Sequence, residues 1–424
     1  MKRNFKKILA AMLAIMATAT QAREFEQLTL NDITHLPEYN DSIGYGFDLG
    51  TSWDGKKADP FFISVRVPDG NYRVTMTLGS RKKAASTTVR AECRRLFIEN
   101  LETRKGETVT RSFLVNKREP EFIDPKGNSA RVAIKDREKG LLHWDNRLTI
   151  EINGDAPQIQ SISIERDTVC PTLYLIGNST VTDQPHEPWA SWGQMVTRWL
   201  SDSIAVANYA ESGLSAQTFI AQRRLDKIVS QLKPGDFVMT EFGHNDQKMD
   251  SYIGFGAYYA FSHNIKIIID NARLKGATPL LCTPTMRRMF EGDRIKNTHV
   301  DYPDAIRDIA AREKITLIDL QKMTGIFYEA MGPENSKQAF VHYPAGTWPG
   351  QTAALADNTH FNPYGAYEIA KMVLQELNDD EKKNTLRRFI TADFKGFDPA
   401  HPDSREDFHW CNCPLSEVAK PDGN

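Results

Sequence analysis

The run Thr172-Leu173-Tyr174-Leu175-Ile176-Gly177 is followed at once by Asn178-Ser179-Thr180. An apolar run of this length that ends in a polar turn is typical of a strand buried on both faces of a parallel sheet. Four similar runs lie at residues 204–208, 237–242, 279–283 and 315–318. Segments with the apolar spacing of helices lie at residues 219–232, 265–274 and 364–377. This alternation predicts a three-layer α/β/α domain with a parallel sheet over residues 168–390.

Residues 23–167 have a different pattern, that of short strands. Phe61 to Val67 and Tyr72 to Leu78 alternate with period two around a Pro-Asp-Gly-Asn turn, which predicts a hairpin-like pair. Further short strands are expected at residues 108–115, 130–134, 148–152 and 159–164. Short strands without a convincing helix predict an all-β sandwich domain before the α/β domain. We expect the C-terminal tail, residues 391–424, to pack back onto these domains.

The composition sets limits on the class of protein. The chain has 424 residues, of which 25% are charged and 40% hydrophobic, and this excludes disordered and collagen-like chains. The mean hydropathy of −0.48 excludes a polytopic membrane protein. The net charge of −2 lacks the basic excess that is typical of nucleic-acid binding. The sequence does not indicate an oligomeric state.

The N-terminus has the three parts of a secretory signal peptide. Lysines and an arginine precede an apolar run from Ile8 to Ala17, and small or polar residues follow to Ala22. That run is shorter than the roughly 20 residues that a membrane span needs. We expect residues 1–22 to be removed on export to the periplasm or the medium, which leaves a net charge of −6. A retained amphipathic anchor is the alternative.

The five cysteines do not form a disulfide scaffold. Because their number is odd, at least one lacks an intramolecular partner, and Cys411 and Cys413 are too close to pair without strain. We expect buried thiols and at most one bridge. A zinc site would need a second ligand cluster at matching spacing, and the sequence shows none, so it implies no metal or organic cofactor.

Polar motifs follow three of the predicted strands, and a fourth precedes the last predicted helix. They are Gly177-Asn178-Ser179-Thr180, Asn208 to Gly213, Gly243-His244-Asn245-Asp246 and Asp357 to Pro363. Each motif alone is ordinary loop composition, but ligands of open α/β sheets bind at the carboxyl ends of the strands. A serine needs a base, a histidine suits that task near neutral pH, and a carboxylate orients the histidine. Ser179, His360 and Asp357 are therefore candidate nucleophile, base and orienting acid.

The tetrahedral intermediate of acyl transfer also needs donors for its oxyanion. The backbone N–H groups of Ser179 and Gly213 and the side-chain amide of Asn245 are the candidate donors. The set Ser179, Gly213, Asn245 and Asp357-x-x-His360 resembles the four sequence blocks of the SGNH (GDSL-type) hydrolases. It is most similar to their rhamnogalacturonan acetylesterase branch. This resemblance implies a serine esterase with these six groups in these roles.

One residue departs from the family pattern, because Asn178 stands where the family usually has Asp. Asn keeps an acceptor oxygen but removes a negative charge beside the nucleophile, which puts the pH profile in doubt. The N-terminal half resembles galactose-binding-like β-sandwiches in its Gly44 to Asp48 stretch. From the sequence, glycan binding and mere scaffolding are equally open for that half.

The substrate class is a further expectation. A rhamnogalacturonan backbone carries carboxylates, and Arg287 and Arg288 follow a predicted strand at the same edge, where they suit carboxylate binding. A solvated pair or a structural salt bridge is the alternative. His342 is a candidate for the sugar groove. We expect a secreted esterase that deacetylates a plant cell-wall polysaccharide; an acetyl xylan esterase, a lipase or thioesterase, and an inactive glycan-binding protein are the alternatives.

Overall fold

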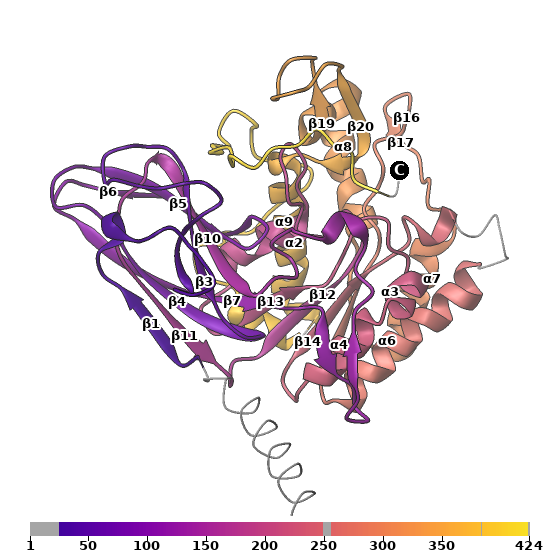
Figure 1. Ribbon diagram of the computed structural model, residues 1–424. Helices are drawn as coiled ribbons and strands as arrows, with labels where there is room; N and C mark the ends of the chain where they lie inside the picture. The colour runs from indigo at the N-terminus through magenta and orange to yellow at the C-terminus, as the bar shows by residue number, and fades with distance from the viewer. Residues whose placement is uncertain (1–24, 249–255, 383, 423–424) are drawn as a thin grey trace, which may run out of the picture.

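The computed structural model describes residues 25–248, 256–382 and 384–422 (Figure 1). The predicted signal peptide, residues 1–22, lies outside the described residues. Among those residues, no helix is both long and apolar enough to cross a bilayer.

The second half of the chain contains the expected parallel sheet. Its strands lie in the order β13-β12-β14-β15-β18. Their bounds are β12 Thr172–Gly177, β13 Ala205–Asn208, β14 Phe237–Glu241, β15 Thr278–Cys282 and β18 Thr316–Ile318. All five strands fall on the apolar runs predicted from the sequence.

Helices cover both faces of this sheet, which confirms the three-layer α/β/α architecture (Figure 1). Leu173 and Leu175 of β12 face one helical layer, and Tyr174 and Ile176 face the other. The first layer contains α2 Trp192–Met195, α8 Leu320–Asn335 and α9 Pro363–Asn378. The second contains α3 Ala216–Ala221, α4 Arg224–Gln231, α6 Ser262–Leu274 and α7 Tyr302–Glu313.

The prediction of one continuous helix over residues 219–232 was wrong. The chain forms two helices there, α3 and α4, separated at Arg223, whose φ is +60°. The carbonyl of Gln222 accepts a hydrogen bond from the N–H of Ala133 at 2.9 Å. The apolar spacing continues across the break, so the periodicity alone does not reveal it.

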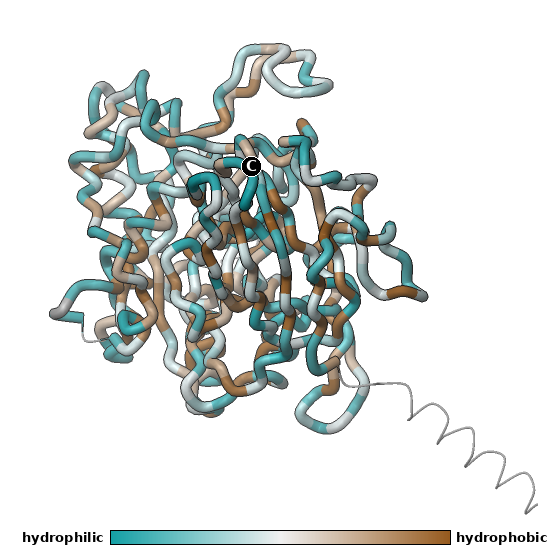
Figure 2. The backbone as a smooth tube through the Cα atoms, turned by 90° about the vertical axis from the view of Figure 1, so that its left-hand side faces the viewer, coloured by the Kyte–Doolittle hydropathy of each residue, from teal (hydrophilic) through white to brown (hydrophobic). Residues whose placement is uncertain are grey.

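The N-terminal half is a β-sandwich of two antiparallel sheets, as predicted. One has the order β1-β11-β4-β7 and the other β2-β3-β10-β5-β6. Their bounds are β1 Gln27–Leu30, β2 Tyr45–Asp48, β3 Phe61–Arg66, β4 Gly70–Gly79, β5 Ala85–Ala91, β6 Arg95–Thr103, β7 Thr108–Lys117, β10 Arg147–Ala156 and β11 Ile159–Asp167. Hydrophobic and hydrophilic residues alternate along many of the strands (Figure 2), and the apolar side chains of both sheets form one core.

The predicted hairpin of residues 61–67 and 72–78 was wrong. Strand β3 pairs with β2 and β10, whereas β4 pairs with β11 and β7 in the other sheet. The turn between them therefore takes the chain from one sheet to the other, and Phe61 and Tyr72 meet in the core between the sheets. Period-two alternation identifies a half-buried strand but not its pairing partner.

The two halves share one sheet. Strand β7 of the sandwich pairs in parallel with β13, with Val115 opposite Val206, so β1-β11-β4-β7 continues into the parallel sheet as nine strands. At this junction the buried guanidinium of Arg95 donates to the carbonyls of Val206 and Asn116, each at 2.7 Å. The sandwich is thus joined to the α/β half through its main chain.

Short elements complete the described chain. Two small pairs of strands are β8 Glu121–Ile123 with β9 Ser129–Arg131, and β16 Phe290–Glu291 with β17 Arg294–Ile295; a third is β19 Phe340–Tyr343 with β20 Leu355–Phe361. Single turns are η1 Ile33–His35, η2 Asp136–Glu138, η3 Val196–Trp199, η4 Ala257–Phe261, η5 Ser336–Ala339, η6 Asp380–Lys382 and η7 Thr385–Phe389. The five cysteines, all within the described residues, are free thiols, and four are buried.

The C-terminal segment runs back over both halves of the molecule. Glu187, fully buried, accepts from the Trp410 indole at 2.7 Å and from the Cys413 N–H at 3.0 Å. The same carboxylate pairs with Arg94 of the sandwich at 3.1 Å. Beyond Cys413 the segment continues across the upper edge of the parallel sheet (Figure 1).

Candidate active site

The four polar motifs meet at the carboxyl edge of the parallel sheet. Ser179 lies two residues after β12, Gly213 lies in the loop after β13, and Asn245 follows β14. Asp357 and His360 lie on β20, directly before α9. This motif has ordinary loop composition, but Asp357 and His360 lie in a strand, because β20 pairs with β19. The start of α9 at Asn362-Pro363 is as predicted, and the Asn362 side chain caps it.

Three side chains form a continuous hydrogen-bonded chain. Ser179 Oγ lies 2.9 Å from His360 Nε2, and His360 Nδ1 lies 2.8 Å from Asp357 Oδ2. All three residues are buried, with exposed fractions of 3%, 1% and 4% for Ser179, His360 and Asp357. A nucleophile, a base and an orienting carboxylate within hydrogen-bond reach of one another are the arrangement that acyl transfer requires.

The surroundings of Asp357 keep it ionised. Burial raises the pKa of the carboxyl, but hydrogen bonds and the charge of His360 outweigh burial and hold the pKa well below its usual range. The Oδ1 atom accepts from the N–H groups of Thr359 and His360, at 2.9 and 3.0 Å. An anionic Asp357 fixes the imidazole orientation in which Nε2 faces Ser179.

Two of the three donors predicted for an oxyanion hole are backbone N–H groups, those of Ser179 and Gly213. Within the described residues, the N–H groups of Ser179 and Gly213 donate to no backbone or side-chain acceptor. Gly213 has φ of +76°, and a Cβ there would lie 2.9 Å from atoms of Lys135 and Asp422, so glycine is required. The Asn245 side-chain amide donates to the Leu214 carbonyl at 3.0 Å, which fixes this amide beside the Gly213 loop.

Asp246 ties the second motif to the third. Its carboxylate accepts from the N–H of Ala216, at 2.8 Å, and from the N–H of Gly243, at 3.0 Å. Burial raises the pKa of Asp246 to about 7. The last residue of the Gly-His-Asn-Asp motif is therefore a positioning residue for the loops that carry Gly213 and Asn245.

Sequence reasoning did not single out Glu241, the last residue of β14. Its buried carboxyl group accepts from the Trp192 indole at 2.6 Å and lies 2.8 Å from Thr180 Oγ1, directly behind the nucleophile loop. Burial raises the pKa of Glu241 to about 7. Asn178 Oδ1 accepts from the N–H and hydroxyl of Thr180, whereas the buried Asn178 Nδ2 has no partner among the described residues. An acid within an apolar strand run carries no local signal of such a contact.

The three predicted substrate contacts lie near this site but make bonds to the protein. Arg288 donates to Ser336 Oγ and Asn358 Oδ1, at 2.9 and 2.8 Å, and also to a backbone carbonyl. His342 Nε2 lies 2.9 Å from the same Asn358 oxygen. Arg287 donates to the His244 carbonyl at 3.0 Å. Arg288 and His342 thus hold Asn358, which is the neighbour of Asp357; substrate contact by any of the three stays a prediction.

Basic side chains and the C-terminal segment flank the site. Burial, together with the positive charges of Arg287 and Lys420, lowers the pKa of Lys248 to about 8, and Asp357 acts in the opposite direction. Lys420 also lines a hollow of about 440 Å³ with Trp189, Gln184 and other residues. The Gln184 amide donates to the Ser179 carbonyl at 2.9 Å, so this hollow adjoins the nucleophile loop.

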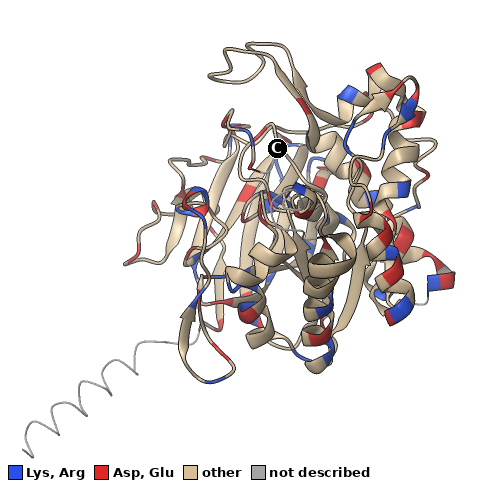
Figure 3. Ribbon diagram, turned by 90° about the vertical axis from the view of Figure 1, so that its right-hand side faces the viewer, with Lys and Arg blue, Asp and Glu red and all other residues tan. Residues whose placement is uncertain are grey.

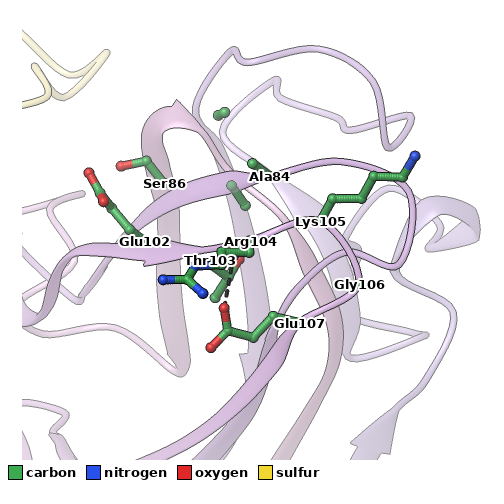
Figure 4. Close-up of a pocket in the computed structure, with 10 residues that line it drawn as sticks. Ala84, Ser86, Glu102, Thr103, Arg104, Lys105, Gly106 and Glu107 are labelled. Atoms are coloured by element: carbon green, nitrogen blue, oxygen red, sulfur yellow. Dashed lines mark hydrogen bonds between the residues drawn. The ribbon is translucent and has the colours of Figure 1, made fainter.

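A second hollow, of about 1140 Å³, lies on the sandwich (Figure 4). Ser86, Glu102, Arg104 and Lys105 are among its lining residues, and none of those residues belongs to the four motifs. Its lining contains no aromatic ring on which a sugar could stack. This hollow is therefore distinct from the candidate active site.

Comparison with known proteins agrees with the fold and identifies the family. Residues 175–366 match the GDSL-like Lipase/Acylhydrolase family. Rhamnogalacturonan acetylesterase RhgT of Bacillus subtilis (strain 168) is 39% identical over 210 residues, which are 49% of this chain and 89% of that protein. The probable rhamnogalacturonan acetylesterase YesY of the same organism is 33% identical over 49% of this chain and 92% of that protein.

A third relative extends beyond the α/β half. The uncharacterized esterase YxiM of Bacillus subtilis (strain 168) is 25% identical over 363 residues, which are 80% of this chain and 84% of that protein. The chain belongs to the GDSL-like lipase/acylhydrolase family. It is an esterase.

Proposed function

We propose that this esterase removes O-acetyl groups from a pectic polysaccharide, with acetylated rhamnogalacturonan as its preferred substrate. The observation that carries the chemistry is the unbroken chain from Ser179 Oγ through His360 to Asp357, at 2.9 and 2.8 Å. The substrate class rests on the 39% identity to RhgT, named a rhamnogalacturonan acetylesterase.

The reaction proceeds in two steps, acylation of Ser179 and hydrolysis of the acetyl-enzyme. Ser179 Oγ attacks the acetyl carbonyl while His360 Nε2 takes the hydroxyl proton, and the N–H groups of Ser179 and Gly213 with the Asn245 amide stabilise the oxyanion. The C–O bond to the sugar breaks and the sugar oxygen takes the proton from His360. Water then gives a proton to His360 and attacks the acetyl-enzyme, and acetate leaves as Ser179 regains its proton.

Charge near the site supports an acidic substrate. Both signs of charge are interspersed on the face of the molecule that Figure 3 shows, so no broad basic face collects polyanions there. Lys248, Arg287 and Lys420 nevertheless interact electrostatically beside Asp357. A local group of cations of this kind attracts a carboxylate-bearing chain within about 10 Å at moderate salt.

The location and domain limits are part of the proposal. The basic, apolar and small-residue parts of residues 1–22 support export by a cleaved signal peptide. In the exported chain, residues 23–167 form the sandwich domain, residues 168–390 the hydrolase domain and residues 391–424 the tail.

Acetate release tests this function on acetylated rhamnogalacturonan, acetylated xylan and a long-chain ester. Ser179→Ala is expected to lower acetate release from the pectic polymer by at least about 10⁴-fold. Ser230→Ala, which changes a serine of α4 away from the site, is the matched control and is expected to keep wild-type turnover. Acetate release that survives in the Ser179→Ala protein would overturn the mechanism.

The three substrates separate the alternatives. Faster turnover of xylan than of the pectic polymer would make the protein an acetyl xylan esterase. Equal or faster turnover of the long-chain ester would favour a lipase or thioesterase. Pectin binding without turnover of any ester would indicate an inactive glycan-binding protein.

The cations have their own test within the same assay. Lys420→Gln is expected to raise KM for acidic oligosaccharides about three- to tenfold, because it removes one of the positive charges beside the site. KM for a small neutral acetate ester is expected to stay unchanged. An equal change on both substrates would contradict carboxylate recognition.

A further inference from the structure

Three potential metal ligands meet where the C-terminal segment passes the end of β10 in the sandwich, and none of them belongs to the chain of Ser179, His360 and Asp357. Asp155 belongs to β10, and His409 and Cys411 belong to the C-terminal segment. His409 Nε2 lies 3.0 Å from Asp155 Oδ2 and 3.6 Å from Cys411 Sγ, and Cys411 Sγ lies 3.8 Å from Asp155 Oδ1. One ligand atom of each residue lies within 4.8 Å of the other two.

The 3.6 Å between His409 Nε2 and Cys411 Sγ matches the separation of two ligands around a tetrahedral zinc ion, whereas the two Asp155 distances run to different carboxylate oxygens and bracket that value. With Zn–S of about 2.3 Å and Zn–N and Zn–O of about 2.1 Å, ligand atoms that share the ion lie roughly 3.4–3.6 Å apart. Thiolate, imidazole and carboxylate are all zinc ligands, and a thiolate with an imidazole favours zinc over magnesium or calcium. Since the thiolate and the carboxylate are anionic, they balance the charge of a divalent ion.

The main chain at two of the ligands is held by neighbouring side chains. The His409 carbonyl accepts from the Asn100 amide at 3.1 Å, and the Cys411 carbonyl accepts from Arg90 at 2.5 Å. Asp155 lies within an irregularity of the β10–β5 register, between Asn153 and Ala156, and its side chain pairs with His409. The C-terminal segment is therefore fixed beside Asp155 before any ion binds, which lowers the ordering cost of binding.

We propose that Asp155, His409 and Cys411 bind one Zn²⁺ ion, with solvent as the fourth ligand. The ion joins the C-terminal segment to the sandwich at the same stretch from which Trp410 and Cys413 reach Glu187. Its role is structural, because no residue of the catalytic chain takes part in it. The sequence does not reveal the site, since Asp155 lies 256 residues before Cys411.

Cobalt reports on the site directly in the full-length, reduced protein freed of metal by a chelator. One Co²⁺ per chain is expected to bind and to give thiolate-to-cobalt charge-transfer absorption together with the strong visible bands of a tetrahedral ion. Zn²⁺ is expected to displace it stoichiometrically. Cys411→Ser is expected to abolish the charge-transfer band, and His409→Gln to weaken Co²⁺ binding at least tenfold.

His401→Gln is the matched control. His401 pairs with Asp398 at 2.7 Å on the same segment, and both are exposed, but no thiol accompanies them. This variant is expected to bind Co²⁺ as the wild type does. Absence of a charge-transfer band in the wild type, or a band that persists in the Cys411→Ser protein, would overturn the proposal.

Thermal unfolding gives a second readout that is independent of catalysis. Zn²⁺ is expected to raise Tm of the wild type by several degrees and to leave Tm of the Cys411→Ser protein unchanged, because only the native site binds the ion. Turnover of a small acetate ester is expected to be equal with and without Zn²⁺. Failure of the esterase proposal would leave both metal readouts intact.

Discussion

Two buried polar regions of this molecule contrast with each other. One is the edge of the parallel sheet with the proposed catalytic residues Ser179, Asp357 and His360, called the catalytic edge below, and the other is the domain junction, where Arg94 and Arg95 of the sandwich meet the α/β half. At the junction, two arginines of the sandwich pair with buried acids of the α/β half: Arg94 with Glu187 at 3.1 Å and Arg95 with Asp183 at 3.2 Å. At the catalytic edge, in contrast, the N–H groups of Ser179 and Gly213 find no acceptor in the described protein.

This difference in hydrogen bonding assigns the two regions different roles: the junction serves stability, and the catalytic edge serves the proposed reaction. A buried charge without its partner costs several kcal/mol, so the junction depends on its pairs being complete. A catalytic donor has to stay free for the oxyanion that forms only during the reaction. Substitutions in the two regions are therefore expected to affect different measurements.

Asp357→Asn is expected to show the largest effect. An amide presents the imidazole with the wrong partner, and kcat is expected to fall by about 10⁴-fold. Tm is expected to change little, because the Asn oxygen still accepts the two backbone N–H groups.

Asp398→Asn is its matched control, because Asp398 and His401 form an exposed pair with the same three-residue spacing. Steady-state kinetics on an acetate ester, with thermal unfolding in parallel, checks both variants. Comparable losses of kcat in the two proteins would contradict the role of Asp357.

Arg94→Met is expected to have the opposite effect, with a large loss of stability and little change in kcat. It leaves Glu187 buried without its cation and is expected to lower the free energy of unfolding by about 3–5 kcal/mol. In the folded fraction, kcat is expected to stay near the wild-type value. Glu187→Gln in the same chain is expected to restore part of the loss, as denaturant unfolding would reveal.

The exposed pair of Arg131 with Glu121 provides the comparison. Arg131→Met is expected to cost less than about 1 kcal/mol, because solvent screens a surface ion pair. Equal losses of stability in Arg94→Met and Arg131→Met would refute the distinction between buried and exposed pairs.

A smaller effect is expected in the pH dependence of the free energy of unfolding. The pKa of Glu241 is raised from 4.5 to about 7 by burial, so the folded protein retains a proton that the unfolded chain releases above pH 4.5. Its contribution to stability is present below pH 4.5 and is lost as pH rises to about 7.

Glu241→Gln is expected to flatten this part of the profile, because the variant has no carboxyl proton at this position to release on unfolding. Denaturant unfolding between pH 4.5 and 7.5 measures the slope of the free energy of unfolding against pH. Glu376→Gln, at an acid that is not fully buried, is the control and is expected to keep the wild-type slope. An identical slope in wild type and Glu241→Gln would rule out a proton on Glu241.

The sequence predicted the catalytic edge much better than the junction. Apolar runs marked every strand of the parallel sheet, and the polar motif after β12 directly named Ser179. Asp357 and His360 were recognisable because they lie three residues apart, within a family pattern. Local patterns of this kind can be recognised in the sequence without knowledge of the tertiary structure.

The junction is made of contacts between distant residues. Arg94 and Glu187 lie 93 positions apart, and neither residue type predicts burial. The pairing of β7 with β13 likewise joins segments whose strand patterns say nothing about their neighbours. The proposed zinc ligands cannot be recognised from their spacing in the sequence for the same reason, because only the fold brings Asp155 to the C-terminal segment.

Asn178→Asp is expected to have the smallest effect, and it sharpens the contrast within the catalytic edge itself. The buried Asn178 Nδ2 has no partner in the described protein, so an Asp oxygen in its place loses no hydrogen bond. The added negative charge lies beside Ser179 and favours the cationic form of the catalytic imidazole. The acidic limb of the kcat/KM profile is therefore expected to move to higher pH by less than about one pH unit.

Turnover of the Asn178→Asp protein at its optimum is expected to stay within about tenfold of the wild type, because the two side chains are nearly isosteric and the acceptor for Thr180 is kept. Asn40→Asp adds the same charge at an exposed turn of the sandwich, keeps the side-chain oxygen that accepts from the Ser42 and Ile43 N–H groups, and is expected to leave the profile in place. A shift toward lower pH in Asn178→Asp would contradict this account, because an added negative charge raises the pKa of every titrating group near it.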